Sequence, residues 1–278
     1  MIICLNGQLV DEHEARISPF DHGLLVGDGV FETLRVYGGV PFAWRRHYER
    51  LVHSAHGLGL AVPELAALRA AADGVLNANG LHDARLRVTV TGGPAPLGSE
   101  RGDAPPTVVV AATVLKQWPP TEAVATVPWP RNERGATAGL KTISYAENVR
   151  ALAYAYERGA NEAIFHNTRG ELCEATGSNL FVVLDGVAVT PPGDSGCLLG
   201  VTRALVLELG REHGIAVEER SLTPDAFARA QEAFLTSTTR EVHPIANVDD
   251  RELPAAPGPV TEQLAEAFKE LVATNLDP

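Results

Sequence analysis

Hydrophobic and polar residues alternate along residues 30–37, and this period of two predicts a half-buried strand. Gly38-Gly39 follows and predicts a turn into a partner strand at residues 40–42. Similar signals predict the other elements of this part of the chain: strands at 1–10, 85–91 and 107–115, and helices at 45–60 and 64–79. The first part of the chain is therefore expected to combine a sheet with two helices.

Strands and helices are also mixed in the rest of the chain. The expected strands are 123–127, 162–166, 179–184, 187–190, 216–220 and 232–236, and the expected helices are 146–158, 201–213 and 260–274, with a short helix after Thr223-Pro224. A turn at residues 168–170 is expected to join two of these strands directly, 162–166 and 179–184. Because strands and helices do not alternate strictly, the pattern favours an α+β protein of two domains over one doubly wound sheet.

The strongest linker signal is Trp118-Pro119-Pro120. We therefore predict an N-terminal α/β domain over residues 1–117, a linker over 118–122 and a C-terminal domain over 123–278. The length of 278 residues is compatible with two domains of ordinary size.

The charge, the cysteines and the length of the apolar stretches exclude several classes of protein. The net charge is -12 and the sequence has no basic cluster, which argues against nucleic acid or an anionic membrane as partner. The three cysteines are widely spaced and show neither metal-ligand spacing nor a disulfide framework, so we expect a reducing compartment. No stretch has the apolar length of a membrane span or the pattern of a signal peptide, so we expect a cytoplasmic protein.

Lys141 is one of three lysines, and it lies in a segment of small residues before the predicted helix at 146. Lysine differs from arginine because it can lose its proton and attack a carbonyl group. The alternative is a solvated surface lysine, which this segment alone does not exclude.

Other segments carry groups that suit an anionic ligand. Gly200-Val201-Thr202-Arg203 begins a predicted helix, where free backbone N–H groups bind anions. Thr236-Ser237-Thr238-Thr239 offers four hydroxyl groups, Arg50 shares a helical face with His47 and Ser54, and Glu174 precedes a buried strand. Each also fits an ordinary polar surface. Together, a lysine, an anion site and a carboxylate match the groups that pyridoxal phosphate requires.

The same segments resemble the class IV aminotransferases, the fold-type IV enzymes that use pyridoxal phosphate. The segments that carry the resemblance are Gly27-Asp28-Gly29-Val30-Phe31-Glu32, His47-x-x-Arg50-Leu51, the Lys141 segment, Glu174-x-x-x-Ser178-Asn179-Leu180-Phe181, Gly200-Val201-Thr202-Arg203 and Thr236-Ser237-Thr238-Thr239-Arg240-Glu241. They occur in the family's order and cover nearly the whole chain.

The resemblance implies a role for each matching residue. Lys141 would hold the cofactor as a Schiff base and move a proton during the reaction, and Glu174 would pair with the ring nitrogen. The phosphate would be held by Arg50, Thr202, Thr238 and the backbone N–H of Val201. Tyr145 would bond the phenolic oxygen, although the family's tyrosine sits one place later.

The resemblance also implies a fold and an assembly. It implies a small N-terminal α/β domain, a larger C-terminal pseudo-barrel domain and the cofactor between them. It further implies a homodimer in which a loop of the neighbour lies near the substrate, an amino acid or a keto acid.

The substrate is the open question. The Thr236–Thr239 segment with Glu241 and Pro244 is most similar to the D-amino acid transaminases. Those enzymes hold the substrate carboxylate with tyrosine, arginine and histidine, and the matching residues here are Val26, Leu97 and Ser99, which carry neither charge nor phenol. The candidates to replace them are Arg35, Arg87, Thr239 and Arg240.

We therefore predict a D-amino acid transaminase and keep three alternatives. The first is a 4-amino-4-deoxychorismate lyase, which would use the same cofactor and lysine to eliminate pyruvate and give 4-aminobenzoate. The second is a branched-chain L-amino acid transaminase, although Ser178 stands where that group usually has an acid. The third is a non-catalytic binding protein, which the presence of both Lys141 and Glu174 disfavours.

Overall fold

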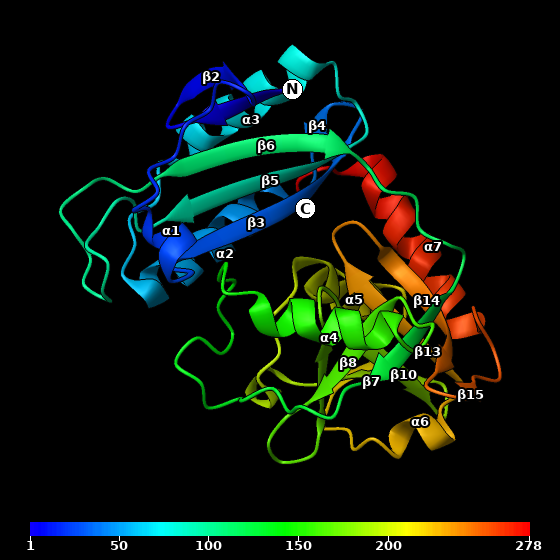
Figure 1. Ribbon diagram of the computed structural model, residues 1–278. Helices are drawn as coiled ribbons and strands as arrows, with labels where there is room; N and C mark the ends of the chain where they lie inside the picture. Colours follow the sequence, from blue (N-terminus) through cyan, green and yellow to red (C-terminus); the bar gives the residue numbers. More distant parts are fainter. The chain divides into compact units, whose positions relative to one another are not determined.

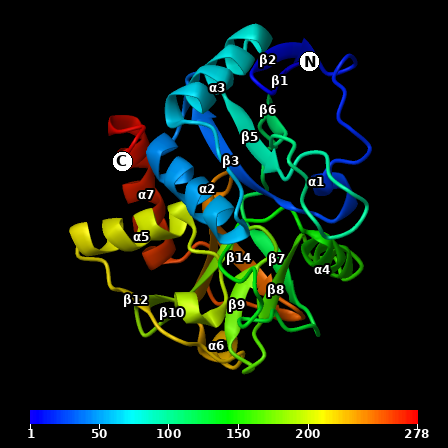
Figure 2. The ribbon, with the colours of Figure 1, turned by 90° about the vertical axis from the view of Figure 1, so that its left-hand side faces the viewer.

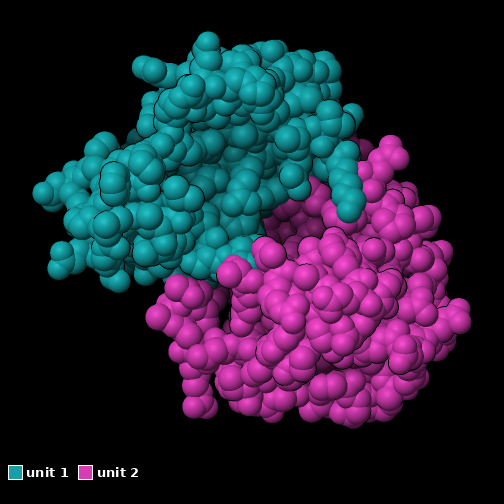
Figure 3. Space-filling view, viewed as in Figure 1, with its two compact units in different colours: residues 1–116, 140–145, 275–278 teal, residues 117–139, 146–274 magenta.

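A computed structural model describes residues 1–278, which form two compact units (Figure 3). Unit 1 consists of residues 1–116, 140–145 and 275–278, and unit 2 consists of residues 117–139 and 146–274. The predicted linker at 118–122 lies near the first passage from unit 1 to unit 2. That residues 118–122 are the linker between two domains stays a prediction.

Unit 1 is built on a six-stranded sheet in the order β2-β1-β6-β5-β3-β4 (Figure 1). All of its strand pairs are antiparallel. The strands are β1 (Ile2–Leu5), β2 (Gln8–Asp11), β3 (Gly29–Tyr37), β4 (Val40–Pro41), β5 (Ala84–Thr91) and β6 (Val108–Val114), and the helices are α1 (His22–Leu25), α2 (Trp44–Leu58) and α3 (Leu65–Asn79). The predicted elements of this part of the chain are confirmed, while the short helix α1 was not predicted.

The period-two pattern of β3 explains how the sheet packs. Leu34 and Val36 point to one face and join the core formed with Trp44 and Leu51 of α2. Figure 2 shows α2 and α3 along the sheet. The alternate residues of β3, beginning with Phe31, point to the opposite face. The strand therefore presents Glu32 to the helices and Phe31 to the other side.

Unit 2 contains a curled, mixed sheet of nine strands. Its main path runs β12-β11-β10-β13-β14-β7-β8-β9, and β15 pairs with β14. The strands are β7 (Glu122–Thr126), β8 (Glu162–His166), β9 (Leu172–Ala175), β10 (Asn179–Leu184), β11 (Val187–Thr190), β12 (Val217–Glu219), β13 (Glu232–Ser237), β14 (Glu241–Val248) and β15 (Arg251–Glu252). The helices are α4 (Ala146–Tyr156), α5 (Val201–Glu212), α6 (Ala226–Arg229) and α7 (Pro259–Thr274), with a 3-10 turn at Gly193–Ser195.

Two details of unit 2 correct the sequence analysis. The turn at 168–170 does not lead directly to β10, because the extra strand β9 follows it and pairs with β8. Glu174 therefore lies within a strand. Strand β14 was also not predicted, and it lies centrally between β13 and β7. The prediction of an α+β protein is confirmed, and none of its helices combines the length and apolar character of a membrane span.

Candidate active site

The backbone of Lys141 is fixed to unit 1 as a short addition to its sheet. Phe31 N–H donates to the Lys141 carbonyl oxygen at 3.0 Å, and Ile143 N–H donates to the Gly29 carbonyl oxygen at 2.9 Å. Lys141 N–H donates to the hydroxyl of Ser54, a fully buried residue of α2, at 3.1 Å. The lysine is therefore anchored to both β3 and α2, unlike a residue in a loose surface loop.

The Lys141 side chain lies beside an aromatic and cationic cluster. Its Nζ atom is 4.4 Å from the centroid of the Phe31 ring, and the guanidinium carbon of Arg87 is 3.7 Å from the same centroid. The amine and the guanidinium group therefore lie within about 8 Å of each other, the sum of these distances. Tyr145 meets the Phe31 ring edge-on at 5.1 Å. The structure thus brings together three residues that the sequence analysis had selected separately: Lys141, Arg87 and Tyr145.

Arg87 makes no ion pair with an acidic side chain. Its Nε atom donates to Thr89 Oγ1 at 3.1 Å, and Arg85 lies on the same face two residues away along β5. Since two arginines on one sheet face repel each other, the site favours an anion. Arg35 lies opposite Arg85 on β3, and its guanidinium carbon is 4.7 Å from the Tyr37 ring centroid.

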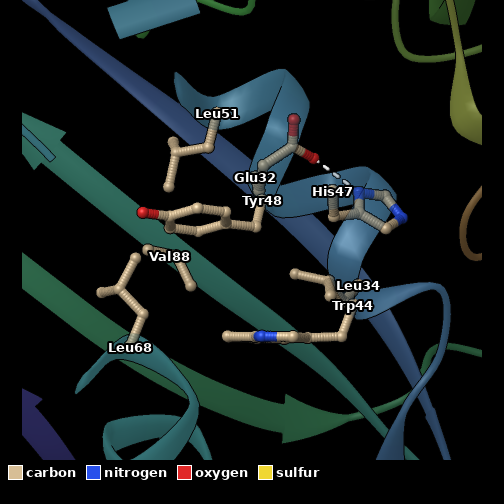
Figure 4. Close-up of a pocket in the computed structure, with 8 residues that line it drawn as sticks. All are labelled: Glu32, Leu34, Trp44, His47, Tyr48, Leu51, Leu68 and Val88. Carbon is tan, nitrogen blue, oxygen red and sulfur yellow. Dashed lines mark hydrogen bonds and ion pairs between the residues drawn. The ribbon is translucent and has the colours of Figure 1, made fainter. Parts of the chain in front are cut away.

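Arg50 belongs to a buried cluster on the helix-facing side of the sheet. Its Nε and Nη2 atoms donate to the two carboxylate oxygens of Glu32, each at 2.7 Å. His47 Nδ1 lies 2.7 Å from Glu32 Oε2 (Figure 4). A cavity of about 10 Å³ adjoins the cluster, with Trp44 and Tyr48 in its wall, and has room for about one water molecule. Glu32 thus fixes one edge of the Arg50 guanidinium, a role that the sequence analysis missed.

Burial and the neighbouring positive charges have opposite effects on the pKa of Glu32. Burial would raise the pKa of Glu32, but the charge and hydrogen bonds of Arg50, with a smaller contribution from His47, lower it to about 2. For His47, burial together with the charges of Arg50 and Lys141 outweighs Glu32 and lowers its pKa. The cluster therefore consists of an ionised Glu32, a charged Arg50 and a neutral His47.

In unit 2, Glu174 is held by two partners. Its Oε1 atom lies 3.5 Å from Nε of Arg131, and its Oε2 atom accepts a hydrogen bond from Leu198 N–H at 3.0 Å. Leu198 lies just before α5, so the carboxylate is tied to the segment that starts this helix. A carboxylate in a partly buried place needs a cationic partner, and Arg131 lies at ion-pair distance from it.

The start of α5 has the features of an anion site. Its first residues, Val201 and Thr202, are buried, and the N-cap residue Gly200 makes no side-chain capping hydrogen bond. A Cβ atom at Gly200 would lie 2.1 Å from Oδ1 of Asn179, so the backbone approach to β10 requires glycine. Asn179 pairs with Thr236 of β13. The helix start and the Thr236 segment therefore belong to the same end of the sheet.

The turn that carries Thr238 and Thr239 joins β13 to β14, with Arg240 as its last residue. Arg240 forms an ion pair with Glu122, lies 3.7 Å from Glu162 and places its guanidinium carbon 3.7 Å above the Trp118 ring. Burial is the main cause that raises the pKa of Glu162. The sequence analysis did not predict this buried network, and it occupies both Nη atoms of Arg240.

Three residues match the positions that hold the substrate carboxylate in the D-amino acid transaminases. All three, Val26, Leu97 and Ser99, lie on exposed segments of unit 1. Val26 ends α1 and is 48% exposed, while Leu97 is 72% exposed and Ser99 is also exposed. Their segments touch, because Ala95 N–H donates to the Phe20 carbonyl oxygen at 3.0 Å. None of the three lies in the cluster around Lys141 that unit 1 forms.

The fold and these residues define an enzyme class. The sequence matches the family model for amino-transferase class IV over residues 29–248, and the chain belongs to this family of pyridoxal-phosphate-dependent aminotransferases.

Individual relatives differ in the substrate that their names give. A branched-chain-amino-acid aminotransferase of Pseudomonas aeruginosa is 33% identical, over 98% of this chain and 93% of its own. A D-alanine aminotransferase of Bacillus licheniformis is 32% identical, over 99% of this chain and 98% of its own. The branched-chain amino acid aminotransferase of Escherichia coli superimposes with a TM-score of 0.92 at 29% identity, covering 97% and 94% of the two chains.

The residues present fit pyridoxal phosphate. Lys141 is an anchored amine within unit 1, and unit 2 by itself holds the Glu174 carboxylate and the start of α5. The buried hydroxyl groups of Ser178 and Thr236 have no hydrogen-bond partner in the protein, as expected near a ligand rich in oxygen.

Proposed function

We propose that the protein moves the amino group of a D-amino acid to a 2-oxo acid, with Lys141 as the catalytic lysine and Arg87 as the contact for the substrate carboxylate. The observation that carries the proposal is the proximity of the Lys141 amine and the Arg87 guanidinium to the same Phe31 ring. In an α-amino acid, the carboxylate is bonded to the carbon that bears the reacting nitrogen. An α-amino acid whose carboxylate binds Arg87 while its α-carbon faces Lys141 is compatible with this arrangement.

The remaining residues take the roles that the family resemblance implies. When bound, the cofactor supplies a carbonyl group that exchanges for the amine and a ring that accepts an electron pair. Lys141 removes the proton from the substrate Cα and returns it as a general acid. Glu174 would pair with the ring nitrogen, and Tyr145 would bond the phenolic oxygen. Arg50, Thr202, Thr238 and Val201 N–H would each contribute to holding the phosphate.

Arg87 suits the carboxylate better than Arg240 does. Arg240 is already paired with Glu122 and Glu162, whereas Arg87 makes no ion pair. Arg35 and Thr239 remain secondary candidates. Bidentate binding of a carboxylate is the geometry that an arginine fork favours.

The choice of a D-amino acid rests on the similarity of the Thr236–Thr239 segment to the D-amino acid transaminases. A branched-chain L-amino acid is the second candidate, because a relative of that name is as similar as the D-alanine enzyme. Elimination of pyruvate from 4-amino-4-deoxychorismate is the third candidate, since it requires the same lysine and cofactor.

One half-reaction distinguishes the candidates. The protein loaded with pyridoxal phosphate is mixed, without a keto acid, with D-alanine, L-leucine or aminodeoxychorismate in separate cuvettes. We expect D-alanine to convert the cofactor to its pyridoxamine form, measured by the loss of its visible absorbance. Conversion by L-leucine alone would identify the branched-chain activity, and release of 4-aminobenzoate alone would identify the lyase. No change with any of the three would contradict the proposal.

We also propose that the protein is a homodimer. Four apolar side chains of touching segments are exposed on unit 1: Phe20, Leu24, Val26 and Leu97. Apolar patches of this kind mark interaction surfaces, and a second copy is the partner that the family resemblance implies. Sedimentation is expected to give a dimer, which Leu24→Asp converts toward monomer. Val114→Asp, at an exposed position of β6 outside the patch, is the matched control, and a monomeric wild-type protein would contradict the proposal.

A further inference from the structure

Arg131 is held rigidly beside Glu174. Its backbone N–H donates to the His166 carbonyl oxygen at 2.8 Å, which fixes the residue next to the end of β8. Its guanidinium carbon lies 4.2 Å from the ring centroid of the fully buried Phe165. A planar cation stacked on an aromatic face keeps its orientation better than a flexible ammonium group would.

The guanidinium group contacts three side chains with three nitrogen atoms. Nε lies 3.5 Å from Oε1 of Glu174, an ion-pair distance without a hydrogen bond. Nη1 donates to Glu147 at 3.1 Å and Nη2 donates to Asn148 at 3.2 Å. Asn148 is itself buried and donates to the Thr176 carbonyl oxygen, next to the end of β9. The network therefore links the start of α4 to the strand that carries Glu174.

One oxygen of Glu174 is held by a hydrogen bond, and the other lies at ion-pair distance from a cation. Arg131 lies on the Oε1 side and Leu198 N–H on the Oε2 side. The opposite charge of Arg131 stabilises the ionised carboxylate in a partly buried place. Because Glu147 balances part of the arginine's charge, the three side chains carry a net charge of −1. A cationic ring nitrogen therefore meets a negative group rather than a neutral pair.

We propose that Arg131 is a positioning residue that holds the Glu174 carboxylate in place for the ring nitrogen of the cofactor. The inference depends on the proposed role of Glu174. Arg131 acts through Glu174 and not on the substrate, so its replacement must weaken the interaction with the ring nitrogen specifically.

The test compares two ligands of the cofactor-free protein: pyridoxal phosphate and its 1-deaza analogue, in which carbon replaces the ring nitrogen. Dissociation constants are measured by absorbance titration for the wild type, Arg131→Met and Arg131→Lys. For Arg131→Met we expect weaker binding of pyridoxal phosphate by roughly 10- to 100-fold, the range for hydrogen bonds to charged groups, with the analogue unchanged. Arg131→Lys keeps the positive charge but lacks the planar guanidinium group, so its loss of affinity for pyridoxal phosphate is expected to be smaller. If Arg131→Met fails to fold, Arg131→Lys takes its place in the test.

Two further variants make the result decisive. Arg150→Met removes another arginine that lies over an aromatic ring, at 5.0 Å from the Trp129 centroid, and should leave both constants unchanged. Glu174→Gln should lose the preference for pyridoxal phosphate. Equal weakening of both ligands by Arg131→Met, or no weakening of either, would overturn the inference. If Glu174→Gln also keeps the preference, the proposed role of Glu174 itself is wrong, and that outcome is distinct from failure of the positioning role alone.

Discussion

Replacement of Lys141 by alanine is expected to abolish the amino-transfer half-reaction, with a rate loss of roughly 10²–10⁴-fold or more, the range for a positioned general base. The Lys141 backbone is held by Ser54 and β3, so the amine is delivered to a defined place. Lys141→Arg should be equally inactive, because a guanidinium group stays protonated and does not attack a carbonyl. Stopped-flow absorbance with the reactive amino acid measures the loss.

The matched control is Lys269→Ala. Lys269 lies on α7, is exposed and pairs only with its neighbour Glu266 at 3.5 Å. We expect this variant to keep the wild-type rate. Borohydride treatment of the loaded wild-type protein should modify the peptide that contains Lys141 and no other. A Lys141→Ala variant that reacts within tenfold of the wild-type rate would show that another group performs the proton transfer.

The second large effect is expected from Glu32→Gln, which should lower the free energy of unfolding by about 3–5 kcal/mol, the range for breaking a buried ion pair. The substitution leaves Arg50 and His47 facing an uncharged amide inside unit 1. Urea denaturation at pH 7 measures the change. Glu252→Gln, at an exposed position of β15, is the control and should change the free energy by less than about 0.5 kcal/mol.

The cluster of Glu32, Arg50 and His47 predicts that the free energy of unfolding depends on pH in the acid range. The folded protein lowers the pKa of Glu32 from 4.5 to about 2, so the folded state binds fewer protons than the unfolded state between these values. The stabilisation is complete above about pH 4.5 and is lost as the pH falls toward 2. Its size is on the order of 3 kcal/mol, since each pKa unit corresponds to about 1.4 kcal/mol. Glu32→Gln should therefore flatten the fall of stability below pH 4.5, and an unchanged profile would contradict the assignment.

Most helices and strands could be predicted because their hydrophobic pattern extends over enough residues to be detected. Strand β3 alternates between buried and partly buried residues from Glu32 to Tyr37, and α2 buries one face that includes Trp44 and Leu51. Strand β9 has four residues, and its sequence Leu-Cys-Glu-Ala neither alternates nor contains a β-branched residue. Strand β14 contains Pro244, and proline in a sequence argues against a central strand, although β14 is one.

The site was predictable where function requires a particular residue type, and not where partners come from distant parts of the chain. Lysine, glutamate and a helix start could be selected from their chemistry. The ion pair of Arg240 with Glu122 joins residues 118 positions apart, and no local pattern reports it. The position of Arg87 over Phe31 also depends on strand register, which sets Phe31 opposite Thr89. The roles of the individual site residues remain predictions for the experiments above.

The segment Leu140–Tyr145 belongs to unit 1, although the residues on both sides of it belong to unit 2. A chimera made by exchanging residues 1–116 with those of a relative would therefore combine a foreign sheet with the native lysine segment. The hydrogen bonds of Lys141 to Phe31 and Ser54 would then join two sequences of different origin. A chimera that keeps the contacts of the catalytic lysine must therefore exchange the whole of unit 1. That requires three segments, residues 1–116, 140–145 and 275–278, instead of a single crossover point.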